Sequence, residues 1–154
     1  QAGSFIYDYL KANGYDDFAI QYDLLPFELN VQAAERTMID KLYALADYYL
    51  AGEISEHSRH IYDIYKLSSI VSVDEKLRHL VVQVAEERRP HSRSLSVQEG
   101  VNIKQVLLEI IEKQVYRNDY EKVTSALLFE SISYDTAVMA LNEIVNSGLY
   151  DGLA

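Results

Sequence analysis

Apolar residues recur every three or four positions through most of the chain, and this spacing restricts the possible folds more than any other feature. Met38, Leu42, Leu45 and Tyr49 form the first stripe, and five similar stripes follow it. In an α-helix, residues with this spacing lie on one face, which can pack against a core. The sequence therefore predicts a mainly α fold, a helical bundle of about six helices.

Residues that favour helix ends mark the boundaries of several stripes. Gly52 follows the first stripe and Gly148 the last, and glycine readily takes the left-handed conformation that ends many helices. Ser58 and Ser133 precede two other stripes, where a serine hydroxyl can cap the first turn. Residues 72–75, Ser-Val-Asp-Glu, have the spacing of a capping box in which the serine is the cap. These signals predict short connections between consecutive helices.

The first 32 residues have a different pattern. Residues 4–13 predict a short helix, whereas residues 18–22 and 27–31 predict two short strands. Two strands alone are only marginally stable, so we expect them to complete a sheet whose other strands lie upstream. The sequence does not begin with Met, which agrees with this expectation. We therefore assign residues 1–32 to a remnant of an upstream α/β layer and residues 33–154 to a C-terminal helical domain.

Composition and charge exclude several classes of protein. The chain contains no Cys, which excludes disulfides and thiolate metal sites. The absence of Cys also favours a reducing compartment, so we predict a cytoplasmic protein. No apolar run approaches the roughly 20 residues that span a bilayer, so we predict no membrane partner. The formal net charge is −10, yet residues 57–93 hold seven Lys or Arg against five Asp or Glu. This region could attract an anion, or its charges could be a chance grouping on solvated helices.

Several familiar catalytic motifs are absent from the sequence. It contains no Asp-x-Asp pair, no His-Glu-x-x-His segment and no glycine-rich phosphate loop. It also lacks the Gly-x-Ser-x-Gly motif of many hydrolases. No His has an Arg five to seven residues before it, which excludes a small helical RNase with an Arg-x(4–6)-His motif. We therefore predict that these residues provide no metal site.

Two stretches on consecutive predicted helices hold the best candidates for chemistry. Lys41 lies in the first stretch, residues 35–49, and Asp63 lies in the second, residues 57–66. A short connection makes such helices neighbours, so the two side chains can meet. A Lys ammonium can neutralise phosphate charge, and an Asp beside it can orient the ammonium or accept a proton. In the alternative, Asp63 forms an ordinary i, i+4 ion pair with Arg59, worth about 0.3 kcal/mol.

The same two stretches resemble the nucleotidyltransferase toxins of the abortive-infection AbiEii/AbiGii type, a type IV toxin–antitoxin family. Residues 36–45 match the family pattern Arg-Thr-x-x-(Asp/Glu)-Lys-x-x-Ala-Leu, and residues 59–64 match Arg-(His/Asp)-x-Tyr-Asp-(Ile/Leu). Residues 116–120 and 133–137 are also similar to members of this family. The resemblance therefore covers nearly the whole chain.

This resemblance implies the C-terminal part of a two-part enzyme that uses Mg²⁺ and transfers a nucleotide from an NTP to an acceptor such as tRNA. It implies that Lys41 and Asp63 are the catalytic residues of the helical part, and we assign Arg36, Arg59 and Lys66 to substrate binding. A cognate antitoxin is the implied protein partner. The Gly-Ser…Asp-x-Asp motif that holds the metal in this family is missing here, so we expect the chain alone to be inactive.

The alternative function is a non-catalytic helical module that binds another protein. The two hypotheses differ in where they place Lys41 and Asp63. If both side chains face one open groove beside the predicted strands, the transferase is favoured. If the two side chains point to separate solvent faces, the interaction module is favoured.

Overall fold

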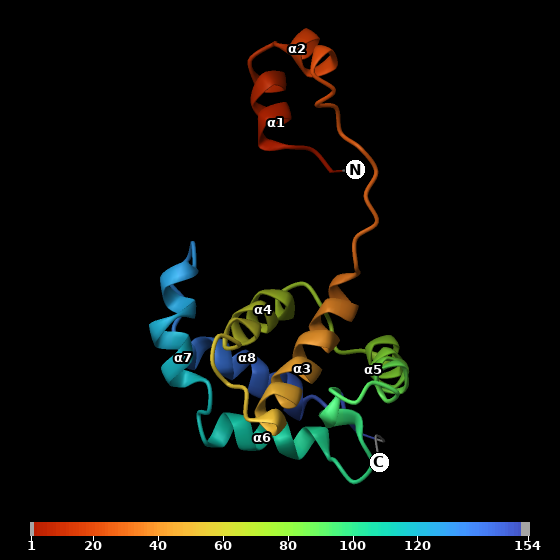
Figure 1. The fold of residues 1–154 in the computed structure, drawn as a ribbon, viewed down its shortest axis with the longest axis vertical. Coiled ribbons are helices and arrows are strands. Elements are labelled where there is room, and N and C mark those ends of the chain that lie inside the picture. Colours follow the sequence, from red (N-terminus) through yellow and green to blue (C-terminus); the bar gives the residue numbers. More distant parts are fainter. Residues whose placement is uncertain (1, 152–154) are drawn as a thin grey trace. The chain divides into compact units, whose positions relative to one another are not determined.

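The computed structural model describes residues 2–151 and is mainly helical, as the apolar spacing predicts (Figure 1). The chain divides into two compact units, residues 1–32 and residues 33–154. None of the helices in the described residues is long and apolar enough to cross a membrane. The described residues form eight α-helices and two 3₁₀ helices: α1 (Phe5–Ala12), α2 (Asp16–Gln21), α3 (Ala34–Ala51), α4 (Arg59–Ser68), α5 (Glu75–Arg88), η1 (Leu95–Val97), α6 (Ile103–Glu112), α7 (Arg117–Lys122), η2 (Thr124–Leu127) and α8 (Tyr134–Asn146).

The predictions of about six helices and of a two-strand remnant are wrong. Residues 18–22 fall largely within α2, and residues 27–31 form no strand. In the described part of the chain, the one β-type pairing is an isolated antiparallel bridge between Ala2 and Phe27. Five residues with mixed apolar and polar character fit either a strand or a short helix. Asp16 and Asp17 lie in the first turn of α2, where acidic side chains interact favourably with the helix dipole.

The first unit contains almost no buried surface of its own. Among residues 2–32, Ala19 is the one buried residue, and α1 and α2 pack mainly on each other. Residues 28–33 then run without regular structure to the start of α3. The hydrophobic core therefore belongs to the second unit.

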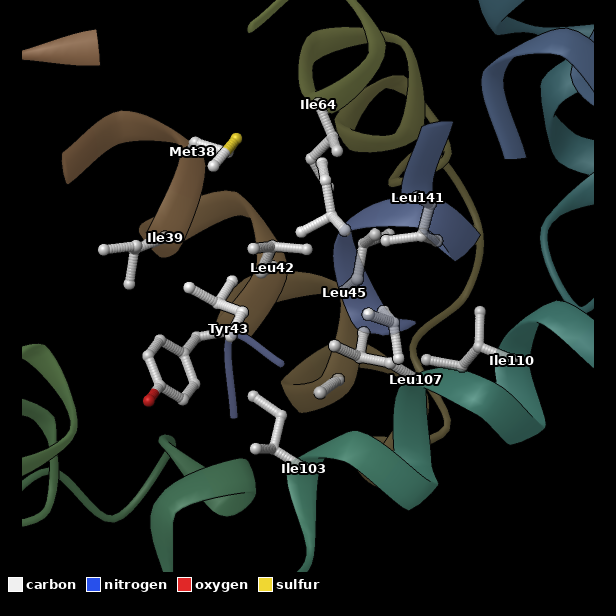
Figure 2. Packing of buried hydrophobic residues seen from close by; sticks show 14 of the residues in the cluster. Met38, Ile39, Leu42, Tyr43, Leu45, Ile64, Ile103, Leu107, Ile110 and Leu141 are labelled. Atoms are coloured by element: carbon white, nitrogen blue, oxygen red, sulfur yellow. The ribbon is translucent and has the colours of Figure 1, made fainter. Parts of the chain in front are cut away.

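Helix α3 supplies the largest share of that core. Its buried face contacts α4, α5, α6 and η1, and Figure 2 shows Leu42 and Leu45 packed among side chains that include Ile64, Leu107 and Leu141. Gly52 ends the helix in the left-handed conformation, with φ = +74°, as the sequence predicts. The buried residues of α3 are Met38, Ile39, Leu42, Tyr43, Leu45, Ala46 and Asp47.

The predicted helix caps are partly correct. Ser133 caps α8, because its hydroxyl oxygen accepts a hydrogen bond from Thr136 N at 3.1 Å. The capping box at residues 72–75 is wrong: Asp74 caps α5 and accepts from Leu77 N at 2.9 Å. Ser58 precedes α4, but its hydroxyl does not cap that helix. Asp and Ser are similarly good caps, so the local sequence does not decide between neighbouring candidates.

We expect Leu42→Ala to lower the free energy of unfolding by about 2–5 kcal/mol, because it leaves a cavity where the side chain is 0% exposed. Met139→Ala is the control, since the Met139 side chain is 64% exposed and its loss should cost less than about 0.5 kcal/mol. Urea denaturation of the two variants measures both values. Equal effects would contradict the central place of α3 in the core.

Candidate functional site

Lys41 and Asp63 meet between two neighbouring helices of the second unit. Lys41 projects from the middle of α3, and Asp63 lies one turn into α4, the helix with which α3 makes its most extensive contact. Lys41 Nζ is 3.0 Å from Asp63 Oδ2. The two side chains are 28% and 36% exposed, so solvent and a ligand can reach them. The sequence placed these groups on adjacent helices, and the structure brings them into an ion pair.

His60 is the third side chain of this contact. It lies one turn before Asp63 on α4 and is buried. Its Nδ1 is 3.2 Å from Lys41 Nζ and 3.7 Å from Asp63 Oδ2, so its hydrogen bond is to the lysine. Burial raises the pKa of the Asp63 carboxyl, but its polar neighbours, among them the Lys41 ammonium, outweigh burial and lower it overall. Asp63 is therefore a carboxylate at neutral pH.

Aromatic rings continue from His60 to Tyr48 on α3 and to His57 in the α3–α4 connection. The Tyr48 and His57 rings stack with their centroids 3.4 Å apart. The His60 ring is nearly parallel to both, at centroid distances of 5.9 Å from Tyr48 and 6.2 Å from His57. Burial lowers the pKa of His57, and the positive charge of the adjacent Arg59 lowers it further. The stack therefore favours a neutral His57.

Asp119 fixes the connection that leads into α4, although it comes from α7. Its two carboxylate oxygens accept hydrogen bonds from Glu56 N (2.9 Å) and Ser58 N (3.2 Å). The Ser58 hydroxyl, which does not cap α4, instead forms a 2.7 Å hydrogen bond with Thr124. Burial raises the pKa of Asp119, but these backbone donors lower it overall. Hydrogen bonds from α7 and η2 therefore fix Glu56 and Ser58, the residues on either side of His57.

Sequence reasoning did not identify His60, Tyr48 or Asp119 as parts of the site. Asp119 lies 61 residues from Ser58, and no periodic pattern connects the two positions. The available signals were His60 in the family pattern at residues 59–64 and Asp119 in the similar segment at residues 116–120. Neither signal indicated what these side chains would contact.

The three residues assigned to substrate binding do not join the Lys41–Asp63 contact through any ion pair or hydrogen bond in the described residues. Arg36 pairs with Asp40 on its own helix at 3.2 Å and with Glu87 on α5 at 2.6 Å. The cause is helical geometry, since Arg36 precedes Lys41 by five residues, about 140° around the helix.

Lys66 and Arg59 lie on the exposed surface of α4. Lys66 pairs with Glu130 at 2.8 Å. The alternative i, i+4 pair between Arg59 and Asp63 does not form within the described residues, because Asp63 turns toward Lys41 on α3. Arg59 is therefore left as a surface cation at the first position of α4.

The residues present do not fit a resident metal ion. Among residues 2–151, no group of three His, Cys, Asp or Glu side chains could hold one. Two cavities of about 680 Å³ and 430 Å³ occur in the second unit, and both are lined by residues other than Lys41 and Asp63. Tyr48 lines the smaller one, together with Arg88 and Arg93. The Lys41–Asp63 pair therefore lies at the surface and not inside either cavity.

Comparison with protein families identifies the family to which this chain belongs. The family model described as "Nucleotidyl transferase AbiEii toxin, Type IV TA system" matches residues 12–140. The chain belongs to the AbiEii family. No curated protein and no solved structure matches the chain. The AbiEii match includes Lys41, His60, Asp63 and Asp119, and it confirms the resemblance that the motifs indicate.

We expect Asp119→Ala to lower the free energy of unfolding by about 1–3 kcal/mol at pH 7, because the buried N–H of Ser58 and the partly buried N–H of Glu56 lose their acceptor. The folded pKa of Asp119 lies below its unfolded value of about 3.9. The ionised Asp119 therefore stabilises the folded state fully above the unfolded pKa. This stabilisation is lost as the pH falls through the lowered pKa of the folded state.

Urea denaturation across this pH range measures the difference between Asp119→Ala and the unmodified chain, which should narrow below about pH 4. Glu86→Ala is the control, because it removes an exposed carboxylate and should have almost no effect. A difference that stays constant at all pH values would contradict a role for the Asp119 charge.

Proposed function

We propose that the chain is the helical portion of a nucleotidyltransferase toxin, in which Lys41 and Asp63 act directly on the nucleotide. The observation that carries this proposal is the 3.0 Å ion pair between the two residues. Its members come from the two stretches that resemble the family, and both lie within the AbiEii match. The two side chains meet and do not point to separate solvent faces, which favours the transferase over a non-catalytic interaction module. The strands expected beside them do not form in residues 2–151, and neither cavity described above includes the pair, so this preference depends on the ion pair alone.

The proposed reaction is attack by an acceptor hydroxyl on the α-phosphate of an NTP. The new bond forms between the acceptor oxygen and the α-phosphorus, and pyrophosphate leaves with the electrons of the broken bond. The Lys41 ammonium contacts the triphosphate and offsets the charge that grows on it. Asp63 orients the ammonium or accepts the proton that the acceptor hydroxyl releases.

The described residues do not fit a Mg²⁺ site, so no step of this proposal passes through a metal held by them. We infer that the metal-binding carboxylates of the full-length toxin belong to an α/β layer outside these residues. In this arrangement, residues 1–32 connect that layer to the helical unit.

The acceptor we propose is an RNA such as tRNA, in a cytoplasmic toxin controlled by a cognate antitoxin. Arg59 and Lys66 are exposed cations on the same helix as Asp63 and are suited to contact phosphates near the reacting groups. The substrate-binding role of Arg36 stays a prediction. Its ion pairs with Asp40 and Glu87 would have to open before it could contact a ligand.

We expect Lys41→Ala in the full-length toxin to reduce nucleotide transfer about 100-fold or more, because the triphosphate loses its cation. Incorporation of radiolabelled nucleotide into tRNA and inhibition of bacterial growth measure the effect. Lys76→Ala is the matched control, since Lys76 is exposed and lies outside both stretches. A Lys41→Ala protein that folds and remains fully toxic would remove Lys41 from the mechanism.

The 154-residue chain alone should transfer no nucleotide to tRNA, even with Mg²⁺ and all four NTPs, since its described residues offer no metal site. The same incorporation assay tests this, with circular dichroism to show that the chain is folded. Transfer that depends on Lys41 in this chain would contradict the proposal that the metal ligands lie elsewhere.

A further inference from the structure

The imidazole of His60 touches the reactive pair but has no part in the reaction proposed above. Its Nδ1 atom is 3.2 Å from Lys41 Nζ, within hydrogen-bond distance. The same atom is 3.7 Å from the Asp63 carboxylate, which is too long for a hydrogen bond. His60 is 7% exposed, so the ring has little freedom to choose other partners.

The chemistry of lysine decides which way this hydrogen bond runs. An ammonium group has three donors and no acceptor, so the nitrogen that faces Lys41 must accept. Nδ1 of His60 can accept only when it carries a lone pair and the ring proton is on Nε2. The contact therefore requires a neutral imidazole in one of its two tautomers.

We propose that His60 is a positioning residue, which holds the Lys41 ammonium through an unprotonated Nδ1 and keeps it beside Asp63 for delivery to the triphosphate. This inference rests on the proposed function of Lys41. Lysine has a flexible stem with four carbons, and an acceptor on each side of its ammonium restricts where that charge can lie. Asp63 supplies one acceptor and His60 the other.

The surroundings of His60 hold the ring in this orientation. The titratable and charged groups that face it are Lys41 and Tyr48 from α3, Asp63 from α4 and His57 from the α3–α4 connection. Tyr48 and His57 stack on each other and lie nearly parallel to the His60 ring. Asp119 holds the backbone on either side of His57. A protonated His60 would have no lone pair for Lys41 and would repel it.

A spectroscopic experiment on the 154-residue chain tests the contact without any assay of activity. In the chain labelled with ¹⁵N-histidine, NMR at neutral pH should show His60 as the neutral tautomer with its proton on Nε2. Lys41→Met should change the Nδ1 signal of His60 and leave that of the exposed His79 unchanged. A proton on Nδ1, or an imidazolium at neutral pH, would overturn the inference.

Two substitutions in the full-length toxin test the consequence for transfer. Asn can place its side-chain oxygen near the position of Nδ1, so His60→Asn should keep nucleotide transfer within about 3-fold of the unmodified protein. His60→Leu fills similar space without an acceptor and should lower kcat/KM for the NTP about 10-fold or more. Thermal unfolding of both variants shows whether lost activity follows lost stability.

The outcomes separate this inference from the proposed function. If Lys41→Ala abolishes transfer while His60→Leu leaves kcat/KM unchanged, His60 is not a positioning residue and the role of Lys41 stands. If NMR shows the expected tautomer while Lys41→Ala remains fully active, the contact exists but the proposed function fails. If both His60 variants lose activity equally and in proportion to their stability, His60 is only a structural residue.

Discussion

The burial of one face of α3 fixes the position of nearly everything else in the second unit. Its apolar side chains lie at the centre of the core (Figure 2). Two buried tyrosine hydroxyls also connect this helix with its neighbours. Tyr43 donates to the carbonyl of Val81 at 3.1 Å, and Tyr116 donates to the carbonyl of Leu45 at 2.8 Å. Because these hydroxyls have partners, their burial does not leave polar atoms without hydrogen bonds. Burial of this face also sets the positions of the polar residues at both edges of α3.

The two polar edges of α3 have different properties. At the α5 edge, the buried Asp47 accepts from Ser96 N (2.7 Å), Ser96 Oγ (2.6 Å) and Arg88 (2.6 Å). A buried carboxylate is tolerated when it has such partners, so this edge stabilises the packing of α5 and η1. At the α4 edge, the Lys41–Asp63 pair is partly exposed, and a phosphate can compete for its ammonium. One helix therefore carries a structural polar network and a candidate reactive pair.

Contacts far apart in the sequence connect the candidate site to the last third of the chain. Asp119 and Thr124 hold Glu56 and Ser58, so the start of α4 depends on α7 and η2. Glu56 has a left-handed backbone with φ = +67°, which is unusual for a residue other than glycine. Its hydrogen bond to Asp119 helps to maintain that conformation. The family match spans all of these positions, in agreement with their joint role in one structural unit.

The sequence by itself determined the mainly helical character, the long helix that ends at Gly52, and the presence of Lys41 and Asp63 on consecutive helices. These features depend on local sequence. With 3.6 residues per turn, the spacing of apolar residues defines the buried face of a helix, and a glycine such as Gly52 marks its end. Only the structure decided that residues 18–21 are helical, that Asp63 pairs with Lys41 and not Arg59, and that His60 and Asp119 contact the residues of the candidate site. A segment of five residues has too little periodicity to define its own structure, and the partners of a side chain depend on which helices pack together. That packing is set by burial over the whole unit, and no single stretch of sequence contains it.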